Sequence, residues 1–235
     1  MTANLLPLII LPMPRISRAI AVGYPHHVTQ RGNYRQTVFA EADDYRKYLD
    51  YLAQYAPQCD LQIWAYCLMP NHVHMVCVPQ QPDSLSRTLH TVHMKYALYF
   101  NKKKETIGHL WQGRFFSCAL DERHVYAAVR YVERNPLRGG LVSAPGDYPW
   151  SSAKVHIAGE SDPVLSGRCF LTETVTDWRQ YLGTGPPDTN EETAVIKATL
   201  TGRPCGGEDF VKDVEESLGR ILTPQPRGRP RKSEK

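Results

Sequence analysis

The 235-residue chain lacks three features, and each absence argues against a class of protein. Its six cysteines form no CxxC pair and no framework spacing, which favours a reduced, cytoplasmic protein over a secreted, disulfide-bonded one. The apolar stretch LLPLIILPM near the N-terminus is interrupted by two prolines and is too short to span a bilayer. No glycine-rich phosphate loop is present. We therefore expect no membrane partner and no nucleotide cofactor.

The composition is that of a mostly folded, mildly basic protein. Hydrophobic residues make up 42% of the chain, enough to bury a core, and the formal net charge of +4 permits a nucleic-acid partner without requiring one. We expect four segments, namely a poorly ordered leader (1–18), a main domain (19–160), a helical C-terminal extension (161–222) and a basic, disordered tail (223–235).

Hydrophobic periodicity in the main domain predicts a β–α–β–β–α–β order followed by one more helix. The expected strands are 23–32, 59–69, 72–79 and 114–120, and the expected helices are 41–56, 83–103 and 122–136. This order is typical of the ferredoxin-like (RRM-like) α+β fold, an antiparallel sheet with two helices on one face. The last helix is expected to end near Asn135, because Pro136 cannot continue it. Three short helices are expected in the extension, at 170–182, 190–202 and 207–222.

The stretch PNHVHMV places two histidines in one predicted strand. Residues two apart in a strand point to the same face, so His72 and His74 are neighbours while Val73 and Met75 point away. Two imidazoles so placed can share a divalent ion. A pair of structural or surface histidines is the commoner meaning of this pattern taken alone.

The predicted helix 122–136 offers groups that complete such a site. Tyr131 and Asn135 are four residues apart and so share one helical face. The asparagine carbonyl can serve as a further ligand for a hard cation, and the tyrosine hydroxyl can attack a phosphodiester held by that cation. The alternative is that Tyr131 belongs to the core and Asn135 merely ends the helix.

The motifs PNHVHMV, HHVTQRGN, GHLWQGRFFS and YVERNPLRGGLV together resemble the REP-associated tyrosine transposases, which are single-tyrosine HUH transposases of insertion sequences. The resemblance covers about residues 13–160. It implies that His72 and His74 are metal ligands, that Tyr131 is the nucleophile, and that Asn135 is the third ligand. Many related enzymes have glutamine at this last position, so Asn135 departs from their pattern.

The resemblance also implies a substrate, a cofactor and a reaction. The protein would be a Mg²⁺- or Mn²⁺-dependent transposase that cleaves and rejoins single-stranded DNA at hairpins through a 5′-phosphotyrosine intermediate. It would be nucleoid-associated and act as a monomer or as a homodimer with the tyrosine helix supplied in trans. The alternatives are a domesticated hairpin-binding protein without transposition activity, and a ferredoxin-like module that binds single-stranded RNA.

Further residues are weaker candidates for the site. Tyr126 is a rival nucleophile, but five residues along a helix do not return to the face of Tyr131. His26 and His27 are adjacent in a predicted strand, so at most one can approach the histidine pair. His90 and His93 have helical spacing and are expected to be surface or packing residues.

Several basic residues are candidate DNA contacts. Arg31 and Arg138 flank the predicted site in sequence, and Arg114 ends the turn Trp111–Arg114, which could stack on a base, hold a phosphate or simply pack the loop. The tail motif RGRPRK resembles an AT-hook, which binds an A·T-rich minor groove. Its arginines are Arg227, Arg229 and Arg231. A generic basic tail is the alternative.

Overall fold

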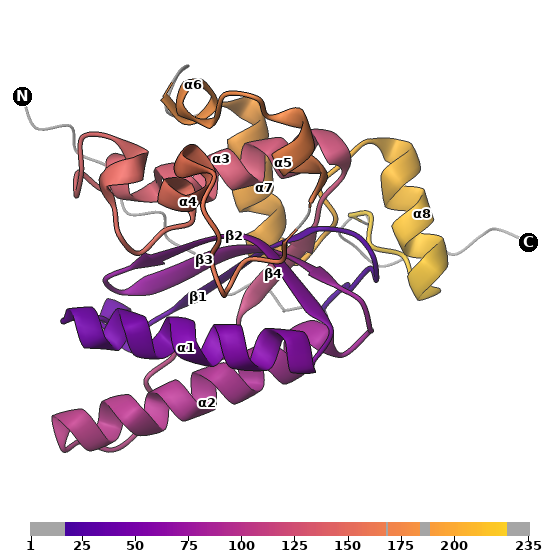
Figure 1. The fold of residues 1–235 in the computed structure, drawn as a ribbon. Helices are drawn as coiled ribbons and strands as arrows, with labels where there is room; N and C mark the ends of the chain where they lie inside the picture. The colour runs from indigo at the N-terminus through magenta and orange to yellow at the C-terminus, as the bar shows by residue number, and fades with distance from the viewer. Residues whose placement is uncertain (1–16, 168, 184–188, 225–235) are drawn as a thin grey trace, which may run out of the picture.

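The computed structural model describes residues 17–167, 169–183 and 189–224, and its centre is a four-stranded antiparallel sheet (Figure 1). The strands are β1 (His26–Arg31), β2 (Leu61–Met69), β3 (His72–Pro79) and β4 (Phe116–Ala119). Their order across the sheet is β2-β3-β1-β4, with every neighbouring pair antiparallel. This is the strand order of the ferredoxin-like fold, so the predicted fold class is confirmed.

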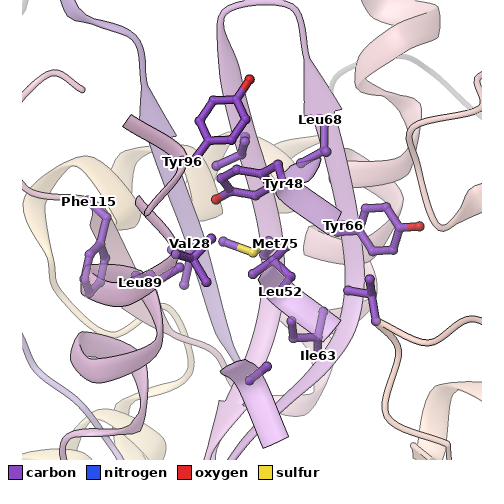
Figure 2. Packing of buried hydrophobic residues seen from close by; sticks show 14 of the residues in the cluster. Val28, Tyr48, Leu52, Ile63, Tyr66, Leu68, Met75, Leu89, Tyr96 and Phe115 are labelled. Atoms are coloured by element: carbon purple, nitrogen blue, oxygen red, sulfur yellow. The ribbon is translucent and has the colours of Figure 1, made fainter. Parts of the chain in front are cut away.

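Helices α1 (Ala42–Gln58) and α2 (Ser84–Lys104) cover one face of the sheet. Alternate residues of the strands point into this layer, where the side chains are buried together. Figure 2 shows Val28 and Met75 of the sheet beside Leu52 of α1 and Leu89 of α2. Truncating a fully buried leucine such as Leu89 to alanine would cost about 2–5 kcal/mol, because the cavity cannot fully collapse.

Helix α3 (Glu122–Arg138) lies on the opposite face, together with α7 (Asn190–Thr201) (Figure 1). Its buried residues Val125, Ala128, Val129 and Val132 recur at three- and four-residue spacing, which forms one apolar stripe against the sheet. Both faces of the sheet are therefore covered. Bases could not stack on an open sheet face, as they do in many RNA-binding modules of this fold.

The prediction that α3 ends near Asn135 is wrong, because the helix continues through Pro136 to Arg138. Pro136 has no N–H to donate to the Val132 carbonyl four residues earlier. The side-chain Nδ2 of Asn135 donates to that carbonyl instead (3.4 Å), and also to the Tyr131 carbonyl (2.9 Å). The asparagine thus supplies a donor where the proline lacks one, and the helix extends another turn.

The predicted helix 170–182 is two helices in the structure, α5 (Phe170–Thr174) and α6 (Trp178–Gly183). The break occurs because Asp177 Oδ1 accepts from the Gln180 N–H at 2.8 Å and so caps a new helix. The remaining elements are α4 (Ala153–Ala158), α8 (Glu208–Leu218) and the short 3₁₀ turns η1 (Asn33–Arg35) and η2 (Pro145–Asp147).

The C-terminal helices share a core with the sheet. Leu171, Trp178, Leu182 and Val195 belong to the same buried cluster as the inner face of α3. Over the residues described, no helix is both long and apolar enough to cross a bilayer. The predicted tail arginines Arg227, Arg229 and Arg231, and nearly all of the predicted leader, lie outside the described residues.

Candidate active site

The two histidines of β3 lie on the face of the sheet that α3 covers, next to the β1 side chains that point to the same face. The antiparallel register pairs Thr29 with His74 and Arg31 with His72. Directly paired residues point to the same face, and so does His27, two residues before Thr29. One sheet face therefore presents His27, Arg31, His72 and His74 to the helix above it.

Helix α3 brings Tyr131 to this face. The ring centroid of Tyr131 is 5.3 Å from that of His74 and 5.7 Å from that of His27, and it meets both rings edge-on. The guanidinium carbon of Arg138, two turns further along the same helix, lies 5.0 Å from the centre of the tyrosine ring. The tyrosine is half-buried, between the histidines and this cation.

Each β3 histidine has a hydrogen-bond partner at Nδ1. The Nδ1 of His72 is 2.5 Å from Oδ1 of Asn71, which can only accept a hydrogen bond. The Nδ1 of His74 is 3.0 Å from Nε2 of His27, and these two rings are stacked with centroids 5.2 Å apart. His27 in turn contacts Thr199 of α7 at 2.7 Å.

Burial keeps these imidazoles neutral. It lowers the pKa of His72 to about 4, with the nearby Arg31 adding to the effect. Burial, together with the neighbouring His72 and His27 and the arginines, also holds the pKa of His74 well below its ordinary value. It also lowers the pKa of His27 to about 3. A neutral imidazole is the form that binds metal ions.

The phenol of Tyr131 experiences opposing effects. Burial raises its pKa, whereas Arg138 and Arg31 act in the opposite direction by favouring the phenolate. The two cations therefore stand where negative charge would develop if the hydroxyl lost its proton.

The third predicted ligand, Asn135, is buried one turn after Tyr131. Its Nδ2 donates to backbone carbonyls of α3, which leaves Oδ1 as an acceptor for another group. In the described ranges, no group of three or more His, Cys, Asp or Glu side chains could hold a metal ion. By donor type, two imidazoles and an amide oxygen can bind a divalent cation such as Mn²⁺, so the chemistry of these residues fits a metal.

The rival residues lie elsewhere. The hydroxyl of Tyr126 is 2.8 Å from Oγ1 of Thr174, under α5. His26 points to the other side of the sheet and donates from Nδ1 to the Tyr24 carbonyl at 2.8 Å. His93 contacts the Tyr48 hydroxyl at 2.9 Å and is a packing residue, as expected.

The turn that ends at Arg114 has one buried residue, Trp111, and three exposed ones. Trp111 is buried against Tyr48 and His93, and its Nε1 donates to the His93 carbonyl at 3.1 Å, so this residue packs the loop. Arg114 is exposed and lines a small cavity with Arg18 and the end of α7. Of the predicted DNA-contacting arginines, only Arg31 and Arg138 lie beside Tyr131 in the described part of the chain.

Two features near the site were not found from the sequence. Tyr34 is 93% exposed in the loop after β1 and, with Arg35, has a positive φ. Hydrogen bonds from Asn33 to Leu110 and from Asn71 to Arg35 hold this loop in place. No residue pattern distinguishes such a tyrosine from any other loop residue.

The second feature is Glu192 in the first turn of α7, which is only 1% exposed. One of its oxygens lies 3.3 Å from Arg138 and the other 3.6 Å from Arg130. Glutamate at the start of a helix is common, because it complements the helix dipole, so the sequence gives no sign that this one is buried against arginines.

Three matches to known proteins bear on this site. Residues 22–135 match the family model described as "Transposase IS200 like". A Haemophilus influenzae protein named as a REP-associated tyrosine transposase is 26% identical over 159 residues, covering 60% of this chain and 90% of that protein. A solved structure of a REP-associated tyrosine transposase bound to a REP hairpin has a TM-score of 0.53 at 21% identity, covering 66% of this chain and 93% of the other. The structural match supports the fold described above.

Proposed function

We propose that this chain, whose residues 22–135 match the IS200-like transposase family model, cleaves and rejoins single-stranded DNA at hairpin sequences with Tyr131 as the nucleophile. The observation that carries the proposal is the position of Tyr131, whose ring is 5.3 Å from that of His74. A tyrosine hydroxyl can serve as the nucleophile of a phosphodiester transfer, and a neighbouring histidine pair can hold the ion that polarises the phosphate.

In the proposed reaction, the hydroxyl oxygen of Tyr131 attacks phosphorus and the bond from phosphorus to the sugar 3′ oxygen breaks. The tyrosine gives up its proton, and the departing 3′ oxygen gains one to become a hydroxyl. The 5′ end stays on the tyrosine as a phosphotyrosine until another 3′-hydroxyl reverses the step. Arg138 and Arg31 would stabilise the phenolate that develops before attack.

His72, His74 and Asn135 would hold the divalent ion. When bound, Mg²⁺ or Mn²⁺ would polarise a non-bridging phosphate oxygen. Imidazole donors suit Mn²⁺ better than Mg²⁺, which prefers oxygen ligands and retains its waters. The chain's own contribution is to present two neutral imidazoles and one amide oxygen from a sheet and a helix that are packed together.

The proposed DNA path runs over the loop after β1. Arg31 and Arg35 would contact phosphates, and the exposed ring of Tyr34 would stack on an unpaired base. Arg114, together with Arg227, Arg229 and Arg231 of the C-terminal segment, would contribute phosphate or minor-groove contacts. Since its substrate is DNA, we expect the protein at the nucleoid.

The proposed site is complete within one chain. Tyr131 lies beside His74 of the same chain, so a monomer would suffice for cleavage and a partner would not need to supply the tyrosine. A dimer that exchanges this helix would need to detach α3 from its buried stripe on the sheet.

Incubation with a 3′-labelled single-stranded hairpin and Mn²⁺, followed by a denaturing gel, tests the proposal. The expected product is a covalent protein–DNA adduct that is absent with EDTA and in Tyr131→Phe. Tyr126→Phe is the matched control, since it removes a hydroxyl from the same helix away from the site, and it should retain the adduct. Undiminished adduct formation by Tyr131→Phe, or tight hairpin binding without any adduct in the unmutated protein, would contradict the proposal.

A further inference from the structure

Helix α7 lies beyond the segment that matches the transposase family, yet two of its side chains contact the candidate site. Thr199 reaches His27 at the sheet, and Glu192 reaches Arg138 at the tyrosine. The helix packs across β1, β4 and α3, so it is placed to fix both halves of the site at once.

A chain of buried hydrogen bonds runs from α7 to the histidine pair. The Thr199 hydroxyl is 2.7 Å from the Val195 carbonyl of its own helix, and its oxygen is 2.7 Å from Nδ1 of His27. Nε2 of His27 is 3.0 Å from Nδ1 of His74. The exposed fractions of His27 and His74 are 1% and 5%, so solvent does not compete for these contacts.

The direction of this chain follows from counting hydrogens. The Thr199 hydroxyl has three polar neighbours, and of these the Val195 carbonyl, at 2.7 Å, can only accept, so we assign the single hydroxyl hydrogen to it. The Thr199 oxygen then accepts from Nδ1 of His27 at 2.7 Å and from the Cys118 thiol at 3.1 Å. A neutral imidazole carries one N–H, so Nε2 of His27 is left as an acceptor and Nδ1 of His74 must be the donor. Nε2 of His74 then keeps its lone pair, as a metal ligand must.

His72 is held in the same Nδ1–H tautomer by a different partner. Asn71 accepts from Nδ1 of His72, and Nδ2 of Asn71 is oriented by the Arg35 carbonyl at 3.2 Å. Both imidazoles therefore present Nε2. Asn71 and His27 thus each favour the Nδ1–H tautomer of the histidine that they contact. Groups that hydrogen-bond the nitrogen not bound to the metal usually have this role at metal-binding histidines.

We propose that Thr199 and His27 are positioning residues that hold His74 in its Nδ1–H tautomer, so that the C-terminal helix α7 is part of the metal centre. The inference rests on the proposed function only in taking His74 as a ligand.

The contact of Glu192 supports the same role for α7. Its carboxylate lies 3.3 Å from Arg138, whose guanidinium lies 5.0 Å from the Tyr131 ring centre. Helix α7 thus contacts Arg138, which lies against Tyr131, near its N-terminus, and His27, which lies against His74, near its C-terminus.

Side-chain ¹H–¹⁵N correlation spectra of the metal-free protein test the hydrogen-bond chain directly, with His74→Gln and His27→Gln used to assign the signals. The expected result is a protonated Nδ1 and an unprotonated Nε2 on both residues. A protonated Nε2 on His74 would overturn the inference. This measurement needs neither metal nor DNA, so it is independent of the proposed function.

Mn²⁺ affinity tests the consequence. Thr199→Val keeps the shape of the side chain but removes the acceptor, and it should weaken Mn²⁺ binding about 10- to 100-fold. Thr199→Ser restores the hydroxyl and should bind within a few-fold of the unmutated protein. Equal affinity in a folded Thr199→Val would overturn the positioning role. If the unmutated protein binds no Mn²⁺, the proposed metal centre fails, and the spectra still decide whether the hydrogen-bond chain exists.

Discussion

The phenol ring of Tyr131 and the imidazole of His74 meet edge-on, with centroids 5.3 Å apart and planes at 89°. One ring comes from the α3 helix and the other from the middle of the sheet, so their approach depends on how α3 packs. The apolar stripe of α3 fixes that packing by burying Val125, Val129 and Val132 against the strands. The hydrophobic core thereby sets the distance between the proposed nucleophile and a proposed metal ligand.

Removing Arg138 should move the pH dependence of cleavage toward alkaline pH. This arginine lowers the pKa of Tyr131, which burial alone would raise further. In Arg138→Leu the phenol is harder to deprotonate, so cleavage near neutral pH should fall about tenfold for each unit by which the pKa rises. Single-turnover adduct formation measured from pH 6 to 10 gives the profile.

The control for this experiment is Arg123→Gln on the same helix. Arg123 is exposed and pairs with Glu191 rather than with the tyrosine. Its profile should match that of the unmutated protein. A uniform loss of rate in Arg138→Leu with no alkaline shift would mean that the arginine acts on the DNA alone.

Tyr34 should contribute to DNA affinity without contributing to stability. Its side chain is almost fully exposed, so Tyr34→Ala removes almost no buried contact. Stacking of one base on an aromatic ring is worth about 1–3 kcal/mol, which corresponds to a rise of about 5- to 150-fold in Kd. Fluorescence anisotropy with a labelled hairpin carrying a single-stranded flank measures this.

Two variants sharpen the Tyr34 experiment. Tyr34→Phe keeps the ring and should bind like the unmutated protein, whereas Ile107→Ala removes an equally exposed apolar side chain from another loop and should have no effect. Equal affinity of Tyr34→Ala for the flanked hairpin would exclude a stacking role for this residue.

Much of the fold and part of the site could be predicted because the relevant signals are local. The two-residue period of a strand places His72 beside His74, and the helical period places Tyr131 on the face of Asn135. Each of these two placements follows from the period of a single element, without knowing which other element packs against it. The strand order followed from the succession of strands and helices and the short connection between β2 and β3.

The rest depends on contacts between distant segments. Which of His26 and His27 approaches the pair is decided by the β1–β3 register, which pairs Thr29 with His74 and so turns His27 toward the site. Thr199 reaches His27 only because α7 packs on the edge of the sheet. Helix α3 continues past Pro136, where the Asn135 side chain donates to the Val132 carbonyl. The general rule that proline ends a helix does not take account of such a side-chain donor.

Lowering the pH should destabilise the protein already at pH values well above those at which carboxylates titrate, because several histidines are buried in the neutral form. Burial lowers the pKa of His93 to about 3, with nearby His90 acting in the same direction, against about 6.5 in the unfolded chain. The contribution of neutral His93 to the free energy of unfolding is complete above pH 6.5. It is lost progressively as the pH falls toward 3, because in this range His93 is protonated in the unfolded state but not in the folded state.

Each such histidine should contribute a slope of about 1.4 kcal/mol per pH unit to the free energy of unfolding. In His93→Gln, which can still accept from the Tyr48 hydroxyl, the slope between pH 6 and pH 4.5 should be smaller by about that amount. Urea unfolding at four pH values measures it. His90→Gln changes the exposed neighbour on the same helix and should leave most of the slope in place. An unchanged slope in His93→Gln would mean that His93 takes up its proton without unfolding, which its hydrogen bond to the fully buried Tyr48 argues against.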